Sequence, residues 1–111
     1  MNKTSTTNVT KLVTRLVEAK AETIKLGMDV HADNVVVCVQ EDASLPRRPL
    51  RMSYEQVLML VKGLVAAGVK VYSCYETGPC GYQLHRGILA AGATNYVVAA
   101  RALSEDRKSV V

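Results

Sequence analysis

Apolar and polar residues alternate along residues 24–31, which predicts a β-strand whose successive side chains point to opposite faces of a sheet. After a short polar turn, residues 35–39 form a continuous apolar run, which predicts a second strand that is buried on both faces. Together the two strands predict the central hairpin of a sheet. Asp29, near the end of the first strand, shares a face with Gly27. That position leaves room for a metal ion or a phosphate, unless Asp29 only helps to start the turn.

Helical spacing precedes the hairpin. From Asn8 onward, apolar residues recur three or four positions apart, which predicts an amphipathic helix that ends near Lys20. The apolar positions are Val9, Leu12, Val13, Leu16 and Val17. This stripe packs either on its own domain, on sequence outside this chain, or on a second subunit.

The hairpin is followed by a pattern typical of a crossover connection. Residues 41–49 contain two prolines and predict a loop, and residues 50–52 predict a third, antiparallel strand. Ser53 and Gln56 match a capping box that begins a helix, and Gly68 is placed to end that helix in a left-handed conformation. Residues 69–75 then predict a strand that a right-handed crossover makes parallel to the first hairpin strand. The helix is expected to bury Val57, Leu58, Val61, Leu64 and Val65.

A second helix and a further strand complete the pattern. Thr77 or Gly78 is the expected cap of the helix, and Pro79 suits its first turn. The expected buried stripe consists of Leu84, Ile88 and Leu89, and the expected end is at Gly92. Residues 93–99 predict another parallel strand, and from Arg101 onward the apolar pattern fails.

The composition indicates one globular domain. The chain has 111 residues, of which 49% are hydrophobic, and its net charge of +4 suits a polyanionic partner without requiring one. It has no apolar run near the roughly 20 residues of a membrane span, and its polar start lacks the apolar centre of a signal peptide. We therefore expect a cytoplasmic protein with no membrane partner. Cys38, Cys74 and Cys80 form no Cys-x-x-Cys pair and are expected to be buried, reduced thiols.

The expected parallel strands bring two acidic residues to one edge of the sheet. Glu76 ends the later strand as Asp29 ends the first, so on neighbouring strands their carboxylates would face each other across a gap of metal-binding size. Two carboxylates are the minimum for a Mg²⁺ or Mn²⁺ site in phosphodiester chemistry, because such hard cations take oxygen ligands and keep several waters. A site for two ions needs more acidic residues. The remaining candidates are Asp33, Glu105 and Asp106, and none of them ends a predicted strand.

Basic and aromatic residues give weaker signals. Arg47, Arg48 and Arg51 form the densest basic cluster, which either contacts nucleic-acid phosphates or belongs to a solvated loop. We expect His31 to support a metal ligand or to contact a phosphate, and His85 to lie on a helix surface or in packing. Tyr75 and Tyr82 flank the loop after Glu76, where they either stack on bases or close the core.

Three motifs in order resemble a known family. They are Gly27-Met28-Asp29-Val30-His31, Tyr75-Glu76-Thr77-Gly78-Pro79-Cys80-Gly81-Tyr82 and Asn95-Tyr96-Val97-Val98-Ala99. Over residues 22–105 the chain resembles the amino-terminal domain of the DEDD insertion-sequence transposases of the "IS one-ten" type, which are bridge-RNA-guided recombinases. The resemblance implies an α/β, RuvC-like fold of the ribonuclease H-like class, a mixed sheet flanked by helices and incomplete at the carboxyl terminus. It also implies metal-dependent DNA cleavage and strand exchange in transposition.

The resemblance assigns roles to particular residues and partners. It implies that Asp29 is the first catalytic acid and Glu76 the second, with Mg²⁺ or Mn²⁺ as cofactor. It implies DNA and a guide RNA as partners and a possible homo-oligomer of the full-length protein. The family's other two aspartates lie in a Thr-Asp-x-x-Asp-Ala helix expected just beyond residue 111, and its nucleophilic serine lies in a later domain. Position 100 is Ala where relatives often have Pro.

The expected organisation follows from these motifs. Residues 1–21 form a tail and an amphipathic helix, residues 22–105 a partial RuvC-like domain, and residues 106–111 a truncated end. We expect this chain alone to bind metal weakly and to be inactive as a transposase. A non-catalytic remnant that binds nucleic acid or a protein partner is an alternative. A second alternative is the first lobe of an actin-like phosphotransferase, although residues 31–34 lack the glycines and threonines of its phosphate-binding turn.

Overall fold

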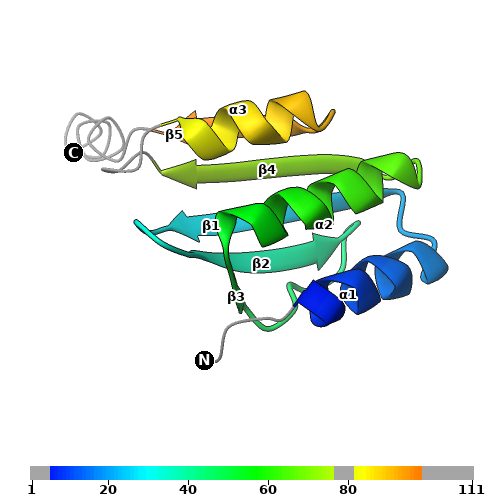
Figure 1. The fold of residues 1–111 in the computed structure, drawn as a ribbon. Coiled ribbons are helices and arrows are strands. Elements are labelled where there is room, and N and C mark those ends of the chain that lie inside the picture. Colours follow the sequence, from blue (N-terminus) through cyan, green and yellow to red (C-terminus); the bar gives the residue numbers. More distant parts are fainter. Residues whose placement is uncertain (1–5, 77–81, 99–111) are drawn as a thin grey trace, which may run out of the picture.

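The computed structural model describes residues 6–76 and 82–98, which form three helices and five strands (Figure 1). In chain order these are α1 (Thr6–Glu18), β1 (Thr23–Val30), β2 (Val35–Glu41), β3 (Leu50–Met52), α2 (Tyr54–Ala66), β4 (Lys70–Glu76), α3 (Gln83–Ala90) and β5 (Thr94–Val98). The described part of the chain is therefore an α/β domain, as the sequence predicts.

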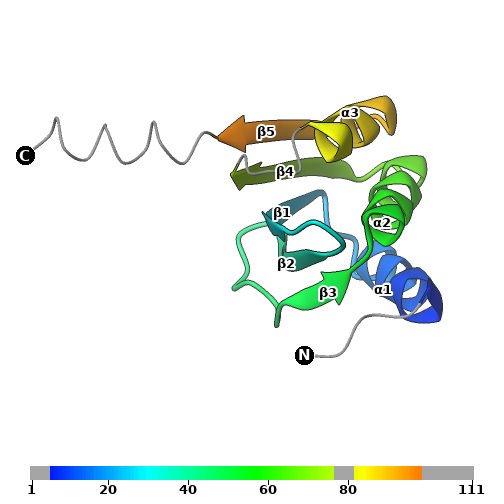
Figure 2. The same cartoon turned by 60° about the vertical axis from the view of Figure 1, so that its left-hand side comes forward.

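The five strands form one mixed sheet in the order β3-β2-β1-β4-β5, with β1 at its centre (Figure 2). β1 is antiparallel to β2 and parallel to β4, while β5 is parallel to β4. The short β3 is antiparallel to β2. This topology confirms the central hairpin, the crossover through α2 and the further parallel strand.

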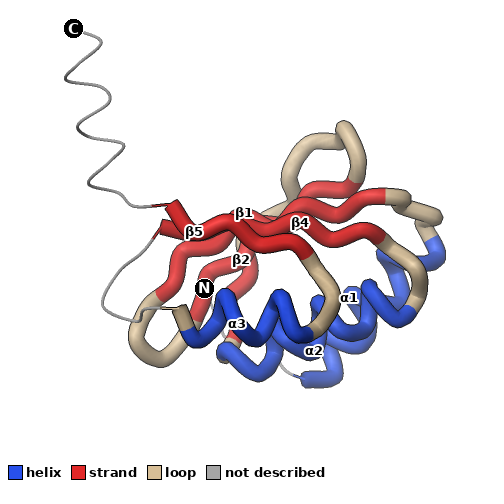
Figure 3. Tube along the Cα trace, turned by 90° about the horizontal axis from the view of Figure 1, so that it is seen from above, coloured by secondary structure: helices blue, strands red, loops and turns tan. Residues whose placement is uncertain are grey.

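All three helices lie on the same side of the sheet, and no described residue outside the sheet forms a layer on the other side (Figure 3). Burial along β1 follows this arrangement. Ile24 and Leu26 are buried beneath the helices, whereas Lys25, Gly27 and Asp29 are exposed on the opposite face. We call these two sides of the sheet the covered face and the open face.

The two-layer arrangement corrects the prediction for residues 35–39. Val35, Val37 and Val39 are fully buried on the covered face. Val36 and Cys38 lie on the open face and are only half-buried. The continuous apolar run was therefore misleading about burial on both faces, because a sequence pattern does not show which faces other elements cover.

The stripe of α1 packs on its own domain. Val9, Leu12 and Leu16 are buried in the core, while Val17 is 36% exposed. Between α1 and α2 the contact is close, since a Cβ built at Gly63 would lie 3.0 Å from a methyl group of Val13. The described residues thus account for most of the amphipathic pattern without a second subunit.

Both predicted signals for α2 are confirmed. The backbone N–H of Gln56 donates to Ser53 Oγ at 3.1 Å, and the backbone N–H of Ser53 donates to Gln56 Oε1 at 2.8 Å. Gly68 follows the helix with φ +86°, the left-handed conformation that glycine adopts without strain. Leu60, which the prediction omits, is fully buried, while Leu58 and Val65 are partly buried against the core.

The predicted stripe of α3 is only partly correct. Leu84 and Ile88 are buried, but Leu89 is 46% exposed because it lies one position beyond Ile88 and so on another side of the helix. Gly92 follows the helix with φ +96°, as predicted for its end. The expected cap at Thr77 or Gly78, with Pro79, lies outside the described residues, and the described helix begins at Gln83.

The described cysteines also differ from the prediction. Cys38 and Cys74 are free thiols, as expected, but Cys74 is exposed and Cys38 only half-buried, because both lie on the open face. Cys80 lies outside the described residues. Within residues 6–76 and 82–98, no helix is long and apolar enough to cross a membrane.

Candidate functional site

Two carboxylates lie side by side at the carboxyl ends of β1 and β4. The parallel register pairs Met28 with Tyr75, so the next residues, Asp29 and Glu76, are neighbours. Both are exposed on the open face, and both line a shallow pocket of about 500 Å³. The structure therefore brings together the two acidic residues that the sequence selects.

Gly27 leaves open space beside these carboxylates. It lies on the open face between Cys38 of β2 and Cys74 of β4. A Cβ built at Gly27 would meet no atom within 4 Å. The absence of a side chain there leaves space beside Asp29, as the sequence predicts, and this space is continuous with the pocket that Gly27, Asp29 and Glu76 line together.

His31 is held next to Asp29. The Nε2 atom of His31 lies 3.1 Å from Asp29 Oδ2. The backbone of His31 is fixed at both ends, because its N–H donates to the carbonyl of Asn34 at 2.8 Å and its carbonyl accepts from the hydroxyl of Tyr54 at 2.6 Å. Both side chains of the pair are more than half exposed, so it contributes little to stability. Its geometry instead orients the Asp29 carboxylate.

The three arginines of the basic cluster have different environments in the structure. Arg47 is half-buried and occupied, because its Nε donates to Glu41 Oε1 at 2.8 Å and its Nη2 contacts the same oxygen. Arg48 and Arg51 are exposed. Arg51 pairs with Val36, which pairs with Asp29, so Arg51 and Asp29 share the open face in one row. Arg48 and Arg51 are thus accessible for phosphates, whereas Arg47 primarily fixes the loop to β2.

The donor set of Asp29 and Glu76 fits a hard divalent cation. Both side chains offer carboxylate oxygens, which Mg²⁺ and Mn²⁺ prefer, and their exposure leaves coordination positions for water or a phosphate. Among the described residues, no group of three His, Cys, Asp or Glu side chains is arranged to hold a metal. Asp33 is instead exposed in the turn, where it accepts from Asn34 Nδ2 at 2.7 Å. Asp29 and Glu76 alone therefore make a weak site. Glu105 and Asp106 lie outside the described residues.

A buried polar network lies on the covered face beneath α3, and the sequence analysis missed it. Ser73 Oγ donates to Asn95 Oδ1 at 2.6 Å, and Asn95 Nδ2 lies 2.8 Å from His85 Nδ1. The hydroxyl of Tyr75 accepts from the backbone N–H of His85 at 3.2 Å. These bonds tie α3 to β4 and β5 next to Glu76. The only sequence signal was the presence of polar residues at positions that strand alternation assigns to the core.

The structure also shows the surroundings of the histidine and the two tyrosines near Glu76. His85 packs against Asn95, in agreement with the packing role predicted for it. Tyr75 is 3% exposed, so it closes the core and is not accessible for stacking on a base. Tyr82 is 51% exposed and meets the ring of His85 edge-on, with ring centroids 6.1 Å apart.

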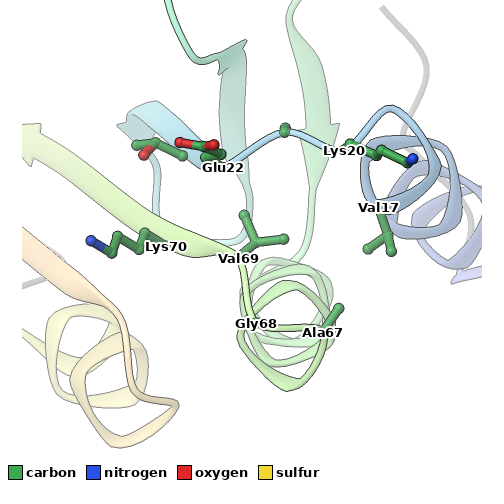
Figure 4. A pocket seen from close by; sticks show the side chains of 9 residues that line it. Val17, Lys20, Glu22, Ala67, Gly68, Val69 and Lys70 are labelled. Atoms are coloured by element: carbon green, nitrogen blue, oxygen red, sulfur yellow. The ribbon is translucent and has the colours of Figure 1, made fainter.

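A second pocket, of about 420 Å³, lies at the opposite end of β1 and β4, next to the ends of α1 and α2 (Figure 4). Lys20 and Lys70 line it, but their ammonium groups point in opposite directions. Val17, Ala67 and Val69 supply much of the remaining lining. Glu22 and Thr23 also line this pocket, so it mixes cations with a single carboxylate and does not bring two carboxylates together on neighbouring strands. The Asp29 and Glu76 pocket is therefore the stronger candidate site.

Comparisons with known proteins do not assign the chain to a family. No protein-family model matches the chain, and no curated protein matches it as a relative. The assignment of a function therefore depends on the sequence motifs and on the geometry at Asp29 and Glu76.

Proposed function

We propose that the chain is the amino-terminal, RuvC-like part of a DEDD insertion-sequence transposase that acts in DNA transposition. In this proposal Asp29 and Glu76 bind Mg²⁺ or Mn²⁺ as half of the acidic set. The remaining acids belong to sequence beyond residue 111. The mixed sheet with helices packed on it is compatible with the ribonuclease H-like class that the motifs imply.

One observation carries the proposal: Asp29 and Glu76 come from sequence motifs far apart in the chain and lie next to each other on parallel strands. Carboxyl ends of parallel strands are where open α/β sheets usually place their sites. Structural stability gives no evident reason for two exposed acidic residues at adjacent positions of neighbouring strands, since like charges opposite each other in a sheet are unfavourable. A bound cation would remove this repulsion.

Each described residue near the site has a part in the proposed chemistry. A divalent cation there would neutralise charge on a phosphodiester and activate an attacking oxygen. Asp29 and Glu76 would hold it, and His31 would hold one oxygen of the Asp29 carboxylate in place. Gly27 leaves the space that a phosphate needs in order to approach.

Binding of Mn²⁺ to the purified chain tests the proposal directly. We expect a dissociation constant on the order of a millimolar, because only two carboxylates contribute. Asp29→Asn and Glu76→Gln should each weaken binding at least tenfold. Electron paramagnetic resonance of free Mn²⁺ during a titration measures this without any need for catalytic activity.

Glu18→Gln is the matched control, because Glu18 is an exposed acid at the end of α1, which leads into the amino end of β1 and not into the carboxyl end where Asp29 lies. It should leave Mn²⁺ affinity within about twofold of the unaltered chain, since long-range effects of one surface charge are small. If all three variants bind Mn²⁺ like the unaltered chain, Asp29 and Glu76 are not a metal site and the proposal is wrong.

The isolated chain is expected to show no metal-dependent cleavage of branched or duplex DNA, because Asp29 and Glu76 are only two of the four acids that the family motifs imply. Cleavage that Asp29→Ala abolishes would show that the two carboxylates suffice.

A second candidate function is a non-catalytic module that binds nucleic acid, which the exposed Arg48 and Arg51 favour. DNA or RNA binding that is unchanged by substitution of Asp29 and Glu76, together with no Mn²⁺ binding, would support that module instead.

A further inference from the structure

Four unpaired cations gather around β3, the outermost strand on one side of the sheet. Lys11 and Arg15 of α1 line a groove of about 210 Å³ together with Leu50, the first residue of β3. Arg51 follows Leu50 in the strand, and Arg48 precedes Leu50 by two residues. We call Lys11, Arg15, Arg48 and Arg51 the basic edge.

These four side chains are exposed, and none of them has an ion-pair or hydrogen-bond partner within the described ranges 6–76 and 82–98. Arg47, which is adjacent in sequence, is instead neutralised by Glu41. The described structure therefore keeps four positive charges around one strand while it pairs the fifth. Four unpaired cations held in one region produce a positive potential that attracts polyanions.

The basic edge surrounds β3 on both sides. Leu50 and Met52 point to the covered face, where α1 contributes Lys11 and Arg15 to the groove. Arg51 points to the open face. A polyanion that crosses the edge of the sheet can therefore contact cations from α1, from the loop and from β3 in succession.

The register connects this edge to the carboxylate site. Arg51, Val36 and Asp29 are paired across β3, β2 and β1, and Glu76 is the next residue in that row. With neighbouring strands about 4.8 Å apart, the backbone at Arg51 lies about 10 Å from that at Asp29. That separation is short enough for one extended polyanion to reach the carboxylates while it remains bound to the edge.

We infer that the basic edge binds the phosphodiester backbone of a nucleic acid and directs it across Val36 toward Asp29 and Glu76. The inference rests on the proposed function, because it supplies the substrate-binding surface for that site. Contacts of this kind bind any sequence, and their strength falls steeply with salt because each neutralised phosphate releases counterions. A short duplex DNA and a short RNA hairpin present the same backbone chemistry, so both serve as probes.

The test compares two variants of the full chain that lose the same charge. In the edge variant, Lys11, Arg15, Arg48 and Arg51 are replaced by Gln. In the control variant, the exposed cations Lys20, Lys62, Lys70 and Arg86 are replaced by Gln. Fluorescence anisotropy with each labelled probe, measured in EDTA over a range of salt concentrations, gives the slope of log affinity against log salt.

We expect the edge variant to reduce that slope by about three to four units for at least one probe, or about one for each lost phosphate contact. Affinity at low salt should fall at least tenfold, while the control variant should change the slope by less than one unit. The probe that shows this difference identifies the nucleic acid that the edge prefers.

Two half variants, one without Lys11 and Arg15 and the other without Arg48 and Arg51, should each lose about half of the slope. They also provide folded alternatives if the edge variant does not fold, which circular dichroism would reveal. Equal losses in the edge and control variants would overturn the inference, because binding would then follow net charge alone. The absence of binding to either probe by the unaltered chain would also overturn it.

Because these measurements are made in EDTA, they do not depend on the metal site. Failure of Mn²⁺ binding with an intact edge effect would refute the proposed function and leave the binding surface. Normal Mn²⁺ binding without an edge effect would refute only the binding surface.

Discussion

The two faces of the sheet differ in almost every physical property. The covered face is apolar, closely packed and paired, and its few polar groups, such as Ser73 and Asn95, are bonded to each other. The open face carries charged, small and aromatic residues, such as Asp29, Gly27 and Tyr96, with wide access to solvent. Successive residues of each strand therefore lie in two different environments, one on each face of the sheet.

This difference indicates a division between residues that stabilise the fold and residues that are available for binding. The free energy of folding comes mainly from apolar burial, which in the described chain lies between the helices and the covered face. The open face contributes little burial, so its residues are available for binding. Substitutions of neighbouring residues in one strand should consequently affect either stability or binding, but rarely both.

Leu26 and Lys25 of β1 provide the strongest test of this division. Leu26→Ala should lower the free energy of unfolding by about 3 kcal/mol, because Leu26 is 1% exposed and its removal leaves a cavity. Lys25→Ala on the open face should change it by about 0.5 kcal/mol or less. Urea denaturation followed by circular dichroism measures both. Similar losses for the two variants would mean that the open face is also buried in solution.

Asn95 and Tyr96 of β5 test the same division for polar and aromatic residues. Asn95→Ala should cost about 2 kcal/mol, because the buried Ser73 and the half-buried His85 lose their bonds to the amide. Tyr96→Ala should cost less than about 1 kcal/mol, since Tyr96 is 60% exposed on an edge strand. Thermal unfolding of both variants gives the comparison, and a larger loss for Tyr96→Ala would reverse the assignment of the faces.

Two glycines give small effects with opposite signs. Gly63→Ala places a methyl group 3.0 Å from the stiff side chain of Val13 and should destabilise the chain by about 1 kcal/mol, net of the better helix propensity of alanine. Gly27→Ala meets no atom within 4 Å and should stabilise the chain by about 0.5 kcal/mol, because glycine is unfavourable inside a strand. Denaturation midpoints of the two variants on opposite sides of the unaltered chain would confirm this; a shift of both in one direction would contradict it.

Local patterns predicted most of the fold. The alternation in residues 24–31, the capping box at Ser53 and the left-handed glycine at Gly68 each depend on neighbours in the sequence, and the structure confirms all three. The crossover connection through a helix then predicted that β4 is parallel to β1. From these elements the proximity of Asp29 and Glu76 followed.

Features that depend on tertiary contacts could not be predicted in this way. The half-burial of Val36 and the exposure of Cys74 result from the lack of a described layer on the open face, which no strand pattern reveals. The pairing of Arg47 with Glu41 depends on how the loop folds back on β2. The contact of Lys11 and Arg15 with the groove beside Leu50 depends on where α1 docks.

The position of β1 also bears on the stage of folding at which Asp29 gains Glu76 as a neighbour. β1 pairs with β2 through a tight local turn, a step that isolated hairpins complete in microseconds. Its pairing with β4 must wait until the long intervening stretch through β3 and α2 is closed, which makes that pairing entropically slower. We therefore expect Asp29 and Glu76 to become neighbours only late in folding. A chain arrested after formation of the hairpin would have its first acid in place and no partner for it.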